Sequence, residues 1–202
     1  MPYILNAGDA PPRYLIILFP GGSGRVEPRM QDGVLLYGFK GNFLLRARPF
    51  IVDDEFATVT TNTTHSPERV QVLLDDLKRR FAGAQIYLMG TSNGSAATMA
   101  LSGYLSERIA GVIHTSSHSE IYGFDTRKYK NRHLIVHHKR DTCRSTPFFA
   151  AEAAHERYGT DFIAMDGGIS VGEPCEAFAH HGYNGIERET AAAIKKWIKQ
   201  GG

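Results

Sequence analysis

Short apolar runs alternate with longer stretches of helical periodicity along most of this chain. The runs are aliphatic or β-branched and are bounded by glycine, proline or polar residues, which is typical of strands buried in a parallel sheet. They cover residues 14–19, 56–60, 85–89, 110–115, 133–138 and 161–165. Strands that alternate with helices predict βαβ units with right-handed crossovers. The expected fold class is therefore α/β, with a mainly parallel twisted sheet and helices on both faces.

Apolar residues recur between these runs at the three- and four-residue spacing of helices. Asn184, with Glu187 three residues later, is the candidate N-cap of the last helix. The least regular pattern lies between residues 24 and 54, where 34–39 is a candidate extra strand and 42–51 a candidate helix disturbed at Pro49. The clearer helices are predicted over residues 67–81, over residues 95–105, from the turn Ser145-Thr146-Pro147 to Gly159, and at the C-terminus.

Composition limits the class of protein but does not identify it. The 202 residues are 42% hydrophobic and 22% charged, close to the averages for globular proteins, and they fit a single domain over residues 1–202. The net charge of +2 comes without a dense basic run, so no nucleic-acid partner is expected. No segment approaches the roughly 18 apolar residues of a membrane span. The first residues also lack the basic and then apolar pattern of a signal peptide.

The strongest chemical signal is Gly90-Thr91-Ser92-Asn93-Gly94, a G-x-S-x-G sequence between a predicted strand and a predicted helix. A serine on such a sharp turn has a strained backbone, and its hydroxyl projects above the sheet. The two glycines leave room for the chain to pass close to its neighbours. An ordinary glycine-rich turn is the alternative, but the strand–turn–helix context favours a nucleophilic serine.

With this motif in place, nearly the whole chain from Tyr14 onward resembles the α/β-hydrolase family. In that family the nucleophile, the acid and the histidine follow in this order, and the acid and histidine lie on loops after late strands. Here residues 133–138 lead to Asp141, and the last strand leads to His181. The resemblance implies that His181 accepts the proton of Ser92 and that Asp141 orients the imidazole. Asp166 is the rival acid, and His180 is the rival base.

The resemblance also implies an oxyanion hole made of backbone N–H groups. One donor is expected from Asn93, which follows the nucleophile, and the other from Gly21 or Gly22 in the glycine-rich loop after the first buried strand. A flexible turn is the alternative for that loop. No metal and no cofactor is expected.

The two cysteines lie on the two loops that must meet if the triad exists. Cys143 is two residues after Asp141, and Cys175 is six residues before His181. A disulfide between them is predicted, with two free thiols as one alternative and a zinc site with His180 as another. A disulfide would indicate a periplasmic or secreted protein, and without one a cytoplasmic location stays open.

The expected reaction is hydrolysis of a small-molecule carboxylic ester, with a short acyl chain or an aryl group, through an acyl-enzyme. Many members of the family insert a cap domain between two late strands, but here only residues 116–132 lie between them, so the site is expected to be lidless. The small size of the chain also resembles cutinases, small bacterial lipases and dienelactone hydrolases. Peptidase, thioesterase and acyltransferase activities use the same triad and are the alternative reactions. The alternative classes of protein are a non-catalytic binding module on the same fold and a flavodoxin-like nucleotide binder. The oligomeric state stays open. Candidate substrate-binding residues are His118, Tyr122 and Tyr183, with Phe124, Phe148 and Phe149 as further aromatic candidates.

Overall fold

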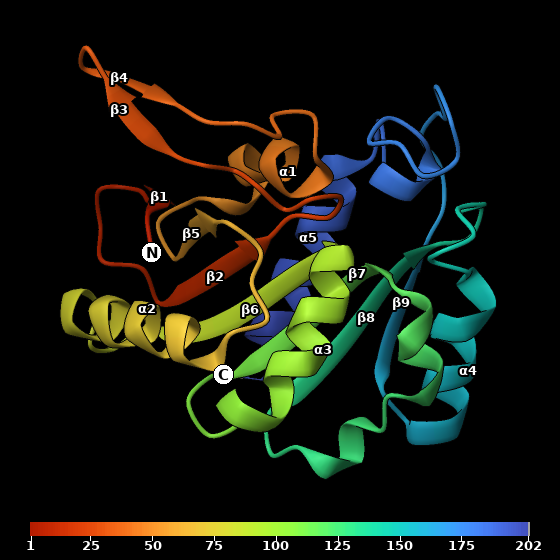
Figure 1. Ribbon diagram of the computed structural model, residues 1–202. Helices are drawn as coiled ribbons and strands as arrows, with labels where there is room; N and C mark the ends of the chain where they lie inside the picture. Colours follow the sequence, from red (N-terminus) through yellow and green to blue (C-terminus); the bar gives the residue numbers. More distant parts are fainter. Residues whose placement is uncertain (202) are drawn as a thin grey trace.

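The computed structural model describes residues 1–201. Its centre is a seven-stranded sheet in the order β1-β5-β2-β6-β7-β8-β9, and the pairing of β1 with β5 is antiparallel while the other neighbours run parallel (Figure 1). The strands are β1 (Tyr3–Asn6), β2 (Tyr14–Phe19), β5 (Phe56–Thr61), β6 (Gln85–Ser92), β7 (Gly111–Ser117), β8 (Arg132–His138) and β9 (Asp161–Met165). The α-helices are α1 (Phe43–Ile51), α2 (Pro67–Arg80), α3 (Asn93–Leu105), α4 (Phe148–Tyr158) and α5 (Glu187–Lys199). The predicted α/β fold class is confirmed.

The helices cover both faces of the sheet because the central strands are apolar on both sides. In β2, Tyr14 and Ile16 pack in the core under α1 and α5, whereas Leu15 and Ile17 pack in the core under α2 and α3. A third, smaller core lies between α3 and α4. In Figure 1, α2, α3 and α4 lie in front of the sheet, and α5 lies behind it.

Several helix ends follow the capping rules used in the prediction. Asn42 caps α1 by accepting a hydrogen bond from Leu44 N–H, and α4 ends at Gly159 in the left-handed conformation (φ 69°). The predicted N-cap at Asn184 is wrong. Helix α5 begins at Glu187 after Ile186, which makes no side-chain cap, because the Asn184 amide donates to Phe178 O instead.

The segment before α1 differs most from the prediction. Only Val34–Leu36 (β4) of the candidate strand is extended, and it pairs with Arg29–Gln31 (β3) in a separate antiparallel hairpin that stands away from the main sheet in Figure 1. The edge strand β1 was not predicted. The connection from β7 to β8 contains two short 3₁₀ helices, Ser119–Gly123 and Thr126–Lys128, and no cap domain.

Within residues 1–201, no helix has both the length and the apolar character that crossing a membrane requires.

Candidate active site

The G-x-S-x-G sequence forms a sharp turn from β6 into α3. Ser92 has φ 53° and ψ −123°, a backbone conformation that costs a non-glycine residue on the order of 1–3 kcal/mol. A Cβ on Gly90 would lie 2.2 Å from Gly94 O, and a Cβ on Gly94 would lie 1.9 Å from Phe19 O. Both glycines are therefore required by close backbone contacts, and the backbone strain falls on Ser92, the central residue of the turn, which lines the pocket.

His181 and Asp141 meet at the carboxyl ends of the strands, although 40 residues separate them. His181 Nδ1 lies 3.0 Å from Asp141 Oδ2, and Thr146 Oγ1 lies 3.0 Å from the same nitrogen. The Thr146 hydroxyl donates to Asp141 Oδ2 at 3.1 Å, so it contacts both the Asp141 carboxylate and the His181 ring. This arrangement places the proton of the neutral ring on Nδ1 and leaves Nε2 free to accept one.

Asp141 is held in its ionised form although its side chain is fully buried. Burial opposes ionisation, but hydrogen bonds from the His137 and His181 side chains and from Cys143 N–H outweigh it and hold the pKa of the carboxyl well below its ordinary value. His137 Nε2 lies 3.4 Å from Asp141 Oδ2 and donates to Thr146 O at 3.0 Å. Sequence reasoning did not assign His137 a role in this network.

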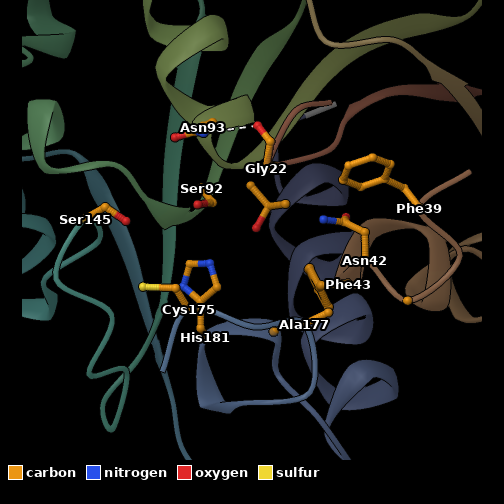
Figure 2. A pocket seen from close by; sticks show the side chains of 14 residues that line it. Gly22, Phe39, Asn42, Phe43, Ser92, Asn93, Ser145, Cys175, Ala177 and His181 are labelled. Atoms are coloured by element: carbon orange, nitrogen blue, oxygen red, sulfur yellow. Dashed lines mark hydrogen bonds between the residues drawn. The ribbon is translucent and has the colours of Figure 1, made fainter. Parts of the chain in front are cut away.

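Ser92 and His181 line the same pocket, with the imidazole beside the serine (Figure 2). No hydrogen bond joins Ser92 Oγ to the His181 ring in this structure; such contacts are often longer without substrate. A Cβ on Gly21 would lie 3.6 Å from Ser92 Oγ, so the glycine-rich loop passes close to the hydroxyl. Asn93 Nδ2 donates to Gly22 O at 3.1 Å and ties this loop to the turn (Figure 2). Gly21, Gly22 and Asn93 therefore line the pocket around Ser92.

No protein-family model and no curated protein sequence matches this chain. Solved structures do match. The chain is similar to Est1E from Butyrivibrio proteoclasticus (16% identity, TM-score 0.67, 95% of this chain and 89% of that one) and to the same protein with ferulic acid bound (15% identity, TM-score 0.70, 99% and 94%). It is also similar to an α/β serine hydrolase without a lid from Xanthomonas campestris (11% identity, TM-score 0.63, 96% and 87%). The chain has the α/β-hydrolase fold.

In this α/β-hydrolase fold, the loop that carries His181 is anchored to two strands by Tyr183. The Tyr183 hydroxyl accepts a hydrogen bond from Ser116 N–H at 2.8 Å and donates one to Val136 O at 2.7 Å. The hydroxyl of Ser116, a residue with φ 39°, donates to His181 O at 2.6 Å. The position of the imidazole is therefore set by the ends of β7 and β8.

Arg46 on α1 anchors the same loop from the other side. Its guanidinium donates to Ala177 O at 3.0 Å, to Gly182 O at 2.7 Å and to Gly41 O. It also forms an ion pair with Glu187 Oε1 at 2.8 Å, and both side chains are largely buried. Because Gly41, Ala177 and Gly182 all line the pocket, this one guanidinium joins two of its walls.

The predicted disulfide between Cys143 and Cys175 is present and links the acid loop to the histidine loop. Both sulfurs are used in this bond, which rules out the zinc site proposed for them with His180. Among residues 1–201, no three His, Cys, Asp or Glu side chains lie together as metal ligands would.

The rival acid and base lie outside the hydrogen-bond network of Asp141 and His181. Asp166 is half-exposed, pairs with Arg140 at 3.0 Å and accepts from Gly167 N–H. His180 stacks on His138, with ring centroids 4.5 Å apart, and its side chain makes no hydrogen bond with Asp141. The structure thus groups Asp141 with His181 and leaves both rivals out.

The pocket that contains Ser92 has a volume of about 540 Å³, and none of the substrate-binding candidates from the sequence lines it. Tyr122 is exposed and accepts a hydrogen bond from Arg157, and Tyr183 is fully buried behind the pocket wall. His118 lies beyond the wall, where its N–H donates to Ser95 Oγ. Phe124, Phe148 and Phe149 also lie outside. Most of the wall that sequence reasoning missed lies in the irregular segment before α1 and at the first residue of that helix: Phe39, Gly41, Asn42 and Phe43.

Proposed function

We propose that this protein is a serine hydrolase that cleaves carboxylic esters of small molecules through an acyl-enzyme. The observation that carries the proposal is one pocket in which a strained Ser92, a histidine bonded to an ionised carboxylate, and a glycine-rich loop meet. The fold similarity to esterases and serine hydrolases supports the same class.

The geometry suggests a role for each group. Ser92 Oγ attacks the ester carbonyl carbon as His181 Nε2 takes its proton, and Asp141 stabilises the imidazolium that forms. Backbone N–H groups of Asn93 and of Gly21 or Gly22 stabilise the oxyanion. Collapse of the tetrahedral intermediate breaks the bond to the alcohol, which receives the proton from His181. Water then repeats the steps on the acyl-enzyme and restores the free serine.

The test is to treat the folded protein with a fluorophosphonate probe and with 4-nitrophenyl butanoate. Wild type should be labelled at Ser92 and should hydrolyse the ester, whereas Ser92→Ala should do neither. Ser145→Ala removes another serine of the same pocket and is the matched control for the labelling site. A folded wild type that neither labels nor hydrolyses any ester would contradict the proposal and favour a binding module.

Paired variants test the assignment of acid and base. Asp141→Asn and His181→Gln should each lower kcat/KM at least about 100-fold, because each disrupts proton transfer from Ser92. Asp166→Asn and His180→Gln make the same changes in the rival residues, which lie outside the triad network, and should stay within a fewfold of wild type. Larger losses in the second pair than in the first would reassign the triad.

Substrate class is the next question. A panel of short-acyl and aryl esters, a feruloyl ester, a thioester and a peptide amide separates esterase from thioesterase and peptidase; the feruloyl ester is included because ferulic acid is bound in a similar structure. Added alcohol as acceptor reports acyl transfer. We further propose a periplasmic or secreted location, which the Cys143–Cys175 disulfide supports.

A further inference from the structure

Asn42 presents a free amide donor to the pocket. Its side-chain oxygen accepts the hydrogen bond of Leu44 N–H at 3.0 Å, and this contact fixes which end of the amide is Oδ1 and which is Nδ2. The nitrogen then points from the start of α1 into the cavity toward Ser92 (Figure 2). Within residues 1–201 no protein group accepts a hydrogen bond from Nδ2.

Two aromatic rings flank this donor. Phe39 lies on one side, and its backbone is held in the left-handed region (φ 60°), which is uncommon for a bulky residue. The turn that produces this conformation is closed by Asn42 N–H donating to Phe39 O at 2.8 Å. Phe43 lies on the other side and packs against Tyr183, with ring centroids 4.4 Å apart. The donor and both rings are therefore held in fixed relation to each other.

The charge of the pocket restricts what can bind to the donor. No Lys or Arg is among the described residues that line it, and the nearby Arg46 is already paired with Glu187 and with backbone carbonyls. An anionic group would thus lose its hydration without gaining a counter-ion. A neutral oxygen of an ether, hydroxyl or carbonyl group needs only the hydrogen bond that Nδ2 offers.

We propose that Asn42 is a specificity-determining residue: its Nδ2 donates to a neutral oxygen on the arm of the ester that lies between Phe39 and Phe43. The protein therefore selects esters that carry such an oxygen over esters whose arm is purely hydrocarbon. A hydrocarbon arm would displace water from the amide and leave it unpaired, which is the basis of discrimination by polar sites. This inference rests on the ester hydrolysis proposed above.

The test replaces one CH₂ of the substrate by oxygen and compares the two esters. One series consists of 4-nitrophenyl hexanoate and its analogues with oxygen at successive chain positions; the other consists of hexyl acetate and the corresponding ethers, followed by pH-stat. Asn42→Ser and Asn42→Asp both keep a side-chain oxygen for the α1 cap, so the helix start is preserved. Asn42→Asp replaces the Nδ2 donor by an acceptor, and Asn42→Ser leaves only a hydroxyl on a shorter side chain, which does not reach the position that Nδ2 occupies. Thermal unfolding checks that each variant is folded.

The quantity compared is the ratio of kcat/KM for each ether to that for its hydrocarbon analogue, which cancels any general loss of activity in a variant. At the oxygen position that reaches Asn42, this ratio should fall about 5- to 10-fold from wild type to Asn42→Ser, the effect of one neutral hydrogen bond. Asn42→Asp should lower it further, because a carboxylate repels the ether oxygen.

The inference would be overturned if the ratio of ether to hydrocarbon kcat/KM agreed within about twofold between wild type and both variants at every position of both series. Ester hydrolysis itself would still stand. A wild type that hydrolyses no member of either series and does not react with the fluorophosphonate would overturn the proposed function and this inference with it.

Discussion

The hydroxyl of Tyr183 joins three segments that are far apart in the sequence. It accepts from Ser116 N–H at the end of β7 and donates to Val136 O in β8, while its ring supports Phe43 in the pocket wall. Burial raises the pKa of this phenol well above its ordinary value, so the hydroxyl keeps its proton and can donate. The residue therefore positions the histidine loop without contacting the pocket.

Tyr183→Phe should lower the free energy of unfolding by about 1–3 kcal/mol, because Ser116 N–H and Val136 O would be buried without a partner. Urea unfolding followed by the fluorescence of Trp197 measures the change. Tyr104→Phe is the control, since Tyr104 is 68% exposed, and it should stay within about 0.5 kcal/mol of wild type. Equal stability of the two variants would show that the Tyr183 hydroxyl does not anchor the loop.

Sequence reasoning predicted the turn at Ser92 and the meeting of Asp141 with His181, but it did not predict the walls of the pocket. Ser92 and its flanking glycines could be predicted because the turn makes demands on adjacent residues. Tyr183 was expected to line the pocket as one of several aromatic residues near the predicted site. Its actual position depends on Phe43 and on two strand ends, which no local pattern of the sequence records.

Among the secondary-structure elements, those with strong periodicity or continuous apolar runs were predicted and the irregular ones were not. The central strands are apolar over their whole length, so their pattern does not depend on a particular neighbour. The hairpin of β3 and β4 is largely exposed and lies apart from the main sheet, and β1 has four residues at an edge. The pocket walls before α1 fall within this poorly patterned segment, which is why the sequence did not reveal Asn42.

Strands β7 and β8 share a buried pair of histidines that the proposed chemistry does not use. His114 Nε2 and His133 Nδ1 lie 3.2 Å apart, and the rings are nearly parallel. Burial is the main cause that lowers the pKa of His114 well below its ordinary value, and the neighbouring His133 lowers it further. Burial also lowers the pKa of His133 to about 4. Both rings are therefore neutral near pH 7 and can share one proton between them as a hydrogen bond.

This pair should make the protein sensitive to mild acid. In the unfolded chain His133 gains its proton near pH 6.5, but in the folded protein only near pH 4, so the unfolded state binds more protons in between. The free energy of unfolding should therefore fall as the pH decreases from about 6.5 to 4, by about 3 kcal/mol from His133 alone, and this contribution should level off below pH 4.

Urea unfolding at a series of pH values tests this account. His133→Gln should remove the His133 contribution to the fall in stability, whereas His65→Gln, a change at an exposed histidine, should keep it. A wild-type slope retained in His133→Gln would contradict this account.

His181, the proposed general base, lies on the long connection between β9 and α5. Between the end of β9 and the start of α5 the chain contains one 3₁₀ turn, His180–Gly182, and otherwise irregular backbone. Such long loops need fixed contacts to hold one conformation. Tyr183 supplies them from the sheet, Arg46 from α1, and the Cys143–Cys175 disulfide from the loop that carries Asp141. The last of these three could be predicted from the sequence, because a triad requires its two loops to meet.

The disulfide acts mainly on the unfolded chain, where it closes a segment with a sequence separation of 32 residues. Loss of that constraint should lower the free energy of unfolding by about 3–4 kcal/mol on the loop-entropy model. Protein that has been reduced and alkylated at both cysteines should therefore unfold at a clearly lower urea concentration than protein treated with the alkylating reagent alone. An unchanged midpoint would mean that the reduced chain keeps enough residual structure when unfolded to restrain this segment without the bond, or that the bond does not form in the native protein. Non-reducing mass spectrometry of the starting material separates these two explanations, because alkylation before reduction would reveal free thiols.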